Sequence, residues 1–97
     1  MIRLRLTDAQ VSALECRGIT DEDEPAISRA WRGSAVLAFE AAEAEALARE
    51  LTEAANAEDA QAEERRTDPE TAKYARAACR SLTAMATKVR KRGSTGS

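Results

Sequence analysis

Apolar residues recur at helical spacing through the second half of the chain, from residue 40 to residue 92. The pattern breaks at Thr67-Asp68-Pro69. Asp68 is a preferred N-cap residue and Pro69 suits the first position of a helix, so one helix ends and the next begins there. A connection this short predicts two long antiparallel helices that lie side by side.

The two predicted helices differ in the stripe that each would bury. The second helix repeats small and apolar residues at an alternating spacing of three and four: Ala72, Ala75, Cys79, Leu82, Ala86 and Val89. The first helix starts with a similar stripe, made of Ala44, Leu47, Leu51 and Ala54. Glu58 and Gln61 take the next positions, so this stripe becomes polar. Alanine stripes let helices approach closely but bury little apolar area for each residue.

The start of the chain has a different pattern. Apolar residues alternate with arginines over residues 2–6, which predicts a short strand with one apolar face. Thr7 and Gln10 have the spacing of a capping box that opens a helix. Gly18 fits the position just after a helix, where the backbone is often left-handed and the helix ends. Residues 2–19 are therefore expected to form a strand, a helix and a stop.

The segment from residue 25 to residue 39 allows two interpretations. In the first, residues 26–31 and 34–39 form a β-hairpin. In the second, residues 24–32 form a helix that stops at Gly33. We favour the hairpin, because the N-terminal strand needs a partner for its backbone groups. The predicted fold is α+β: a short N-terminal strand and helix, a β-hairpin, and a long antiparallel helical hairpin.

Length and composition predict one small domain over residues 1–92, followed by a flexible tail at residues 93–97. Alanine is the most frequent residue and large apolar side chains are few. The hydrophobic core is therefore small, and its burial offsets little of the conformational entropy that the chain loses on folding. We therefore expect a homodimer. No apolar run approaches the roughly 20 residues of a membrane span, and the alternating start is unlike a signal peptide. A cytoplasmic protein without a membrane partner is expected.

The net charge of −2 hides a division along the chain. Residues 73–97 hold seven basic residues and no acid, whereas residues 1–72 hold all 17 acids and eight arginines. This asymmetry is typical of a nucleic-acid tail or of a basic helix that lies on an acidic one. We favour the second interpretation, because a tight turn joins the acidic stretch to the basic one. Trp31, Arg76 and Arg80 are the candidate partner-binding residues.

Several residue types that common reactions need are missing. The chain has no histidine, which excludes a conventional catalytic triad and histidine-bound zinc. It has no glycine-rich phosphate loop, and its two cysteines lack metal-like spacing. The acidic loop at residues 20–24 lacks the alternating carboxylates and glycine of a calcium site. We expect a non-enzyme with reduced cysteines, no cofactor and no metal.

Residues 2–20 resemble a ribbon-helix-helix repressor: Ile-Arg-Leu-Arg-Leu-Thr-Asp-Ala-Gln-Val-Ser-Ala-Leu, then Gly18-Ile19-Thr20. In that family the strand pairs across a dimer, and its outward residues read the major groove of DNA; Arg3 and Arg5 match those positions. The second helix of the family binds phosphate, but residues 21–24 are all acidic here and would repel it.

An alternative function is therefore DNA binding, either through Arg3 and Arg5 or through a basic C-terminal arm. The arm would consist of Lys88, Arg90, Lys91 and Arg92. The composition of the chain, rich in Ala, Arg and Glu, is also similar to that of small accessory proteins of high-GC actinobacteria and their phages. That similarity suggests an adaptor. The leading hypothesis is a non-enzymatic protein that binds another protein.

Overall fold

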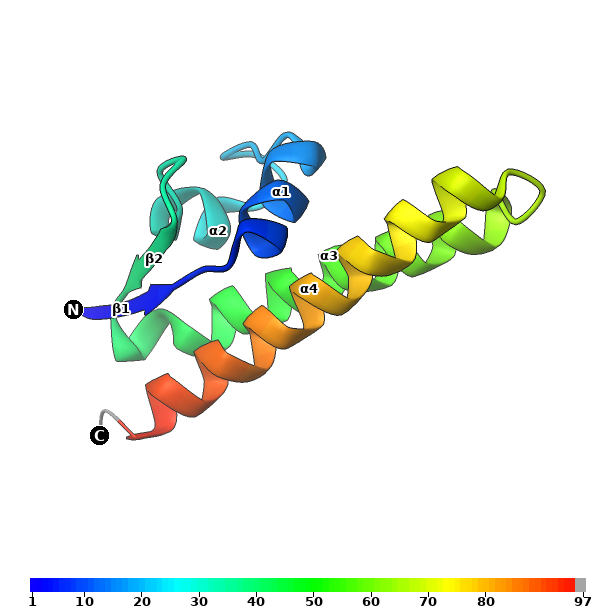
Figure 1. Ribbon diagram of the computed structural model, residues 1–97. Coiled ribbons are helices and arrows are strands. Elements are labelled where there is room, and N and C mark those ends of the chain that lie inside the picture. Colours follow the sequence, from blue (N-terminus) through cyan, green and yellow to red (C-terminus); the bar gives the residue numbers. More distant parts are fainter. Residues whose placement is uncertain (96–97) are drawn as a thin grey trace.

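The computed structural model describes residues 1–95 and has the predicted α+β class. A two-stranded sheet and two short helices lie along one side of a long helical hairpin (Figure 1). The elements in chain order are β1 (Ile2–Arg5), α1 (Asp8–Arg17), α2 (Pro25–Ala30), β2 (Val36–Phe39), the 3₁₀ turn η1 (Ala41–Glu43), α3 (Ala44–Glu64) and α4 (Pro69–Thr95).

Helix α1 begins and ends where the sequence predicts. The Thr7 hydroxyl accepts a hydrogen bond from the backbone N–H of Gln10, and the Gln10 side chain accepts one from the backbone N–H of Thr7. Gly18 follows the helix with φ of 64°, a left-handed conformation that costs glycine little. The predicted capping box and stop are both confirmed.

The two strands pair antiparallel, but one of them is not where the favoured interpretation put it. β2 pairs with β1, with Leu4 opposite Leu37, whereas residues 25–30 form helix α2. Glu50 explains this helix. Its carboxylate accepts hydrogen bonds from the backbone N–H groups of Ala26 and Ile27, which are the free donors of the first turn of α2. The strand predicted at residues 26–31 is therefore wrong, and the second interpretation, a helix within residues 24–32, is confirmed by α2.

The sheet turns its apolar face toward the helical hairpin. Leu4, Leu37 and Phe39 are buried, while Arg3 and Arg5 point outward. This follows from the two-residue period of a strand. The side chains that are fully buried and large belong to one continuous core: Leu14, Ile27, Leu37, Leu47, Leu51, Leu82, Met85 and Val89. The core joins the N-terminal layer to one half of the hairpin.

The helical hairpin has the predicted connection. Asp68 caps α4, since its carboxylate accepts hydrogen bonds from the backbone N–H and the hydroxyl of Thr71. The far end of α4 is longer than predicted, because residues 93–95 continue the helix instead of forming a flexible tail; residues 96 and 97 lie outside the described part. Gly93 packs so closely on Ala44 that an added Cβ would collide with its methyl group.

The hairpin extends well beyond the N-terminal layer (Figure 1). The molecule measures 46 × 24 × 21 Å, and its accessible surface is 6160 Å². A monomer of this mass typically exposes about 5,400 Å². The excess belongs to an elongated shape, in which the distal part of the hairpin has its own small cluster of Ala62, Ala72 and Ala75.

Candidate protein-binding groove

A groove opens where α1 leaves the surface of the hairpin. Its volume is about 390 Å³. Its lining residues are mostly small and come from three helices: Ala9, Ser12, Ala13 and Cys16 of α1, Glu58 and Gln61 of α3, and Thr71, Tyr74, Ala75, Ala77, Ala78 and Ser81 of α4. The groove is therefore a shallow, largely apolar surface with hydroxyl groups along it.

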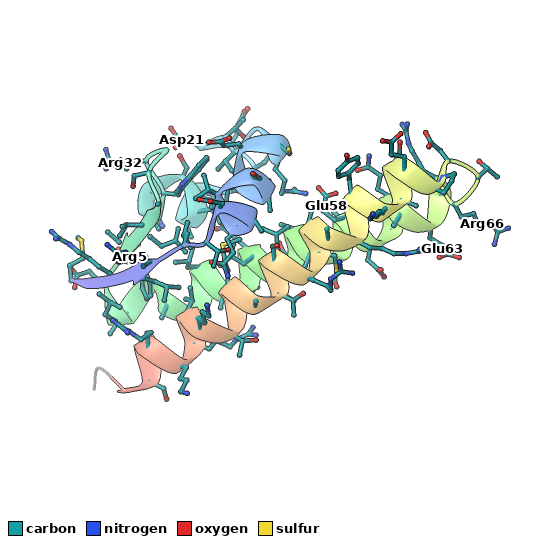
Figure 2. The ribbon with its side chains drawn as sticks, in the orientation of Figure 1. Arg5, Asp21, Arg32, Glu58, Glu63 and Arg66 are labelled. Carbon is teal, nitrogen blue, oxygen red and sulfur yellow. The ribbon has the colours of Figure 1, made fainter. Side chains whose placement is uncertain are left out.

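The sequence explains why the groove lies at this place. The buried stripe of α3 becomes polar at Glu58 and Gln61. Burying these polar side chains would gain no hydrophobic stabilisation, so there is little driving force to cover them. Figure 2 shows Glu58 in the angle between α1 and the hairpin. On α4, the alanines at this level are too small to fill the angle. The polar break in the stripe and the small size of alanine together leave the hollow.

Tyr74 is the most conspicuous side chain of the groove. Its side chain lies on the groove side of α4 and is 68% exposed, although it is one of only three aromatic residues in the chain. Among the described large apolar or aromatic residues, only Met1 shares this exposure. Tyrosine is enriched among the residues that dominate binding energy at protein interfaces. The groove thus combines an exposed aromatic side chain with an alanine floor, which consists of Ala75, Ala77 and Ala78 of α4.

Arg17 holds α1 in place beside the groove. Its guanidinium donates to Glu24 at 2.9 Å and to Glu58 at 3.4 Å, so one cation links α1, the start of α2 and α3. Burial acts to lower the pKa of Arg17, but the hydrogen bond and charge of Glu24, followed by Glu58, raise it overall. These contacts fix the Glu58 carboxylate beside α1.

Trp31 lies away from the groove and serves the fold. Its indole N–H donates to the backbone oxygen of Ser34 at 2.7 Å, and its ring packs against the core. Its backbone also forms a bridge with Leu37. A half-buried ring with an occupied donor offers little to a partner, so the structure gives the prediction for Trp31 no support.

Arg76 and Arg80 lie on the opposite side of α4 from the groove. Arg76 is two residues from Tyr74, a rotation of about 200° around a helix. Both arginines are exposed, and neither takes part in an ion pair among the described residues. The expected pairing of a basic helix with an acidic one is found at Arg90 and Glu45, 3.6 Å apart. Arg76 and Arg80 remain available to a partner.

The candidate nucleic-acid residues come together at the other end of the molecule. The Arg92 guanidinium donates to the backbone oxygen of Arg3 at 3.2 Å, which brings the end of α4 to β1. Arg5 is exposed on the same strand, and Lys88, Arg90 and Lys91 are exposed on the last turns of α4. In Figure 2, Arg5 lies far from the loop that carries Arg66. Two basic segments that are far apart in sequence thus form one basic end.

Other kinds of site have no counterpart in residues 1–95. No group of three or more His, Cys, Asp or Glu side chains there is arranged to hold a metal ion. None of the helices in this part of the chain is both long enough and apolar enough to cross a membrane. No protein-family model, curated protein or solved structure matches the chain.

The sequence did contain a signal for Tyr74. This residue stands outside the alternating stripe of α4, two positions after Ala72, so helical periodicity puts it on an exposed face. A large aromatic residue on a face that periodicity predicts to be exposed is a better indicator of a binding surface than Trp31. Trp31 lies beside an apolar segment, where an aromatic ring is expected to pack into the core. The groove itself had no such signal, because it depends on where α1 packs.

Proposed function

We propose that the protein is a non-enzymatic interaction protein that receives a helix of another protein in the groove. The observation that carries the proposal is the exposed Tyr74 beside an alanine floor. Small residues let a second helix approach closely, and helices that dock in grooves are a common mode of recognition. Tyr74 would supply the apolar and hydrogen-bonding contact that anchors such a helix. We expect the protein to work in the cytoplasm.

Selection from a display library of helical peptides tests this proposal without knowledge of the natural partner. We expect the wild-type protein to select helical peptides that no longer bind Tyr74→Ala or Ser81→Arg, since the first removes the anchor and the second fills the groove. Trp31→Phe is the matched control, because it changes an aromatic residue outside the groove. Peptides that bind all these variants equally, or no selected peptides at all, would contradict the proposal.

Self-association is a second part of the proposal and uses the opposite face of the hairpin. Arg76 and Arg80 are exposed on α4, while Asp59 and Glu63 are exposed on α3, where Glu63 also forms a 3.9 Å surface ion pair with Arg66. Asp59 and Glu63 are each two residues from Gln61 of the groove, so they lie on the far side of α3. Stacking two such faces about an axis parallel to the hairpin brings the basic α4 of one copy onto the acidic α3 of its partner. This complementarity supports a homodimer.

Sedimentation equilibrium tests the homodimer. At tens of micromolar, an order of magnitude at which modest association is populated, we expect dimers of the wild-type protein. The double variant Arg76→Glu, Arg80→Glu should be monomeric and equally stable, because neither arginine has an ion pair within residues 1–95. High salt should also dissociate the dimer. A wild-type protein that stays monomeric throughout this range would contradict self-association.

The basic end supports DNA binding as the alternative function. The contact between Arg92 and Arg3 is the observation in its favour, because it unites the strand of the ribbon-helix-helix resemblance with the basic arm. Lys and Arg side chains that contact phosphates give binding that weakens steeply with salt. A mobility shift on generic duplex DNA at low salt, lost in Arg5→Ala, Lys88→Ala, would favour this function. No shift at low salt would exclude it.

A further inference from the structure

We infer that the outer edge of β1 accepts an extended segment of a partner protein as a third, antiparallel strand, and that this segment carries acidic residues at alternate positions. This surface lies outside the groove, so the inference goes beyond the proposed function and does not depend on it. The backbone groups of the edge give the position of the added strand, and the side chains around the edge give its chemistry.

The register of the sheet identifies the backbone groups of β1 that face away from β2. The backbone N–H of Leu6 donates to the backbone oxygen of Ala35 at 2.7 Å, so these two residues form a hydrogen-bonded pair. Hydrogen-bonded and non-hydrogen-bonded pairs alternate along an antiparallel ladder. Arg3 and Arg5 are therefore in non-hydrogen-bonded pairs, and their N–H and C=O groups point toward the outer edge of β1.

The outer edge of β1 is mostly unpaired. Within residues 1–95, one of its four outward groups has a hydrogen-bond partner: the backbone oxygen of Arg3 accepts from the guanidinium of Arg92 at 3.2 Å. The outer edge of β2 is occupied instead, because Trp31 forms a bridge with Leu37 there. Unpaired backbone groups on an edge strand are a template for another strand. The sheet can therefore grow at β1.

The two faces of the sheet specify the side chains of the added strand. On the inner face, Leu4 is buried but Ile2 is only half-buried, so apolar residues of a third strand would extend the core over Ile2. On the outer face, Arg3 and Arg5 are exposed, and opposite charges on neighbouring strands stabilise a sheet. The partner segment therefore follows the pattern acidic, apolar, acidic.

The end of α4 adds to the positive charge at this edge. Arg92 reaches β1, and Lys88 comes four residues before it, so both lie on the same face of α4. Residues 73–97 contain no acid, so no carboxylate on this helix opposes them. An acidic strand on the edge of β1 would be attracted from both elements.

Four acids lie near this end of the molecule on other elements. Glu43 forms an ion pair with an arginine of α2 and Glu45 forms one with an arginine of α4, each at 3.6 Å. Glu40 follows β2, across the sheet from the outer edge of β1, and Asp8 begins α1 beyond the end of the strand. The bases of β1 and of the last turns of α4 outnumber Glu40 and Asp8, so the potential at the edge is positive.

The same charges argue against other occupants of the edge. If a second copy paired its β1 antiparallel through the groups of both Arg3 and Arg5, arginine would lie opposite arginine, and two basic helix ends would meet. A nucleic acid would be attracted by the bases, but it has no peptide backbone to continue the ladder. An acidic strand of another protein satisfies both the backbone and the charges.

Alternating peptides of about eight residues, within the usual length of a strand, provide the test. One peptide alternates Glu with Val, and two matched peptides carry Gln or Lys in place of Glu. Fluorescence anisotropy of the labelled peptides gives their affinities. We expect the Glu peptide to bind about tenfold or more tightly than the Gln peptide, because the Gln peptide retains the backbone but not the charge. The Lys peptide should bind most weakly.

Methylation of the peptide backbone separates strand addition from simple attraction between charges. In the antiparallel pair, the N–H groups of the Glu residues opposite Arg3 and Arg5 point toward β1. N-methylation of these Glu residues removes the donors and should lower the affinity about tenfold or more. N-methylation of the Val residues is the matched control, since their N–H groups face away. Equal effects of the two methylation patterns would mean that no ladder forms, and would overturn the inference.

Charge reversal on the protein locates the peptide. The variant Arg3→Glu, Arg5→Glu should lose binding of the Glu peptide. The control Arg32→Glu, Arg66→Glu changes the net charge equally at exposed positions away from the edge, and should retain most of the binding (Figure 2). Tyr74→Ala should bind the peptide as the wild type does, because Tyr74 belongs to the groove.

The possible results separate this inference from the proposed functions. Loss of peptide binding in Tyr74→Ala would place the peptide in the groove, and an equal loss in the control variant would assign binding to net charge; either result overturns the inference. If the Glu peptide does not bind but duplex DNA binds through Arg3 and Arg5, the basic end is a nucleic-acid surface and the inference is wrong. Binding that needs these arginines and the Glu amides, but not Tyr74, supports the third strand even if no helix enters the groove.

Discussion

The two halves of the helical hairpin are built from the same helices but hold together differently. The proximal half lies under the N-terminal layer and buries Leu47, Leu51, Leu82, Met85 and Val89. The distal half protrudes, and its separate cluster contains only Ala62, Ala72 and Ala75. A buried leucine contributes roughly 1.5–3 kcal/mol, and a methyl group contributes far less. Helices α3 and α4 therefore run without interruption from a well-packed proximal region, called the firm region below, into a weakly packed distal region.

This difference matters because the groove lies at the boundary. One wall, α1, is joined to the firm region through Leu14 and through the Arg17 ion pairs. The other wall carries Tyr74 and belongs to the distal half. Binding surfaces are often found in the less stable part of a protein, since they must adjust to a ligand. Substitutions in the two halves should therefore have different effects on unfolding.

The largest effect is expected in the proximal half. Leu82→Ala removes a fully buried side chain at the centre of the core, and we expect a loss of about 2–4 kcal/mol in the free energy of unfolding. Urea denaturation followed by circular dichroism measures this loss. A change within about 0.5 kcal/mol, which is typical of surface positions, would mean that this face of α4 is exposed.

A matched pair of alanine substitutions should separate the two halves. Ala86→Gly and Ala75→Gly change the same residue type in the same helix, and each should cost about 1 kcal/mol locally. Ala86 belongs to the main core, so its cost should appear in global unfolding. Ala75 belongs to the distal cluster, so native-state hydrogen exchange should speed up mainly on either side of the hairpin loop. Equal changes in global unfolding for both variants would show that the hairpin unfolds as one unit.

The smallest effect is expected from Asp68 at the distal end. The hydroxyl and the backbone N–H of Thr71 lower the pKa of Asp68 below its ordinary value of 3.8. The ionised form is therefore favoured in the folded state, and its stabilising contribution is complete above pH 3.8. The contribution is lost as the pH falls through the lowered pKa. In acid, amide exchange in the first turn of α4 should rise more in the wild type than in Asp68→Asn; parallel pH profiles would contradict this.

The parts of the fold that depend on neighbouring residues were predictable. The Thr7–Gln10 capping box, the stop at Gly18 and the cap at Asp68 were all confirmed, because each involves residues within a few positions of one another. The α4 stripe was also correct: Ala75, Leu82 and its other members except the half-buried Cys79 are buried. The local physics of caps and of helical periodicity is sufficient for such features.

The parts that depend on distant residues were not predictable in the same way. Helix α2 is stabilised by Glu50, which lies more than twenty residues further along the chain. The groove depends on the packing angle of α1, which no local pattern specifies. The continuation of α4 through Gly93 depends on the close contact with Ala44. The partner-binding residues, the homodimer and DNA binding remain predictions.

The contact between Arg92 and Arg3 has a consequence for how the chain folds during synthesis. The two residues are 89 positions apart, so β1 leaves the ribosome long before the helix that covers its sheet. Leu4 and Phe39 belong to the same core as Val89 and must remain uncovered until α4 has been made. The N-terminal layer is translated first but completes its packing last. Folding of this layer is therefore expected only after α4 has left the ribosome, and the apolar face of β1 stays exposed until then.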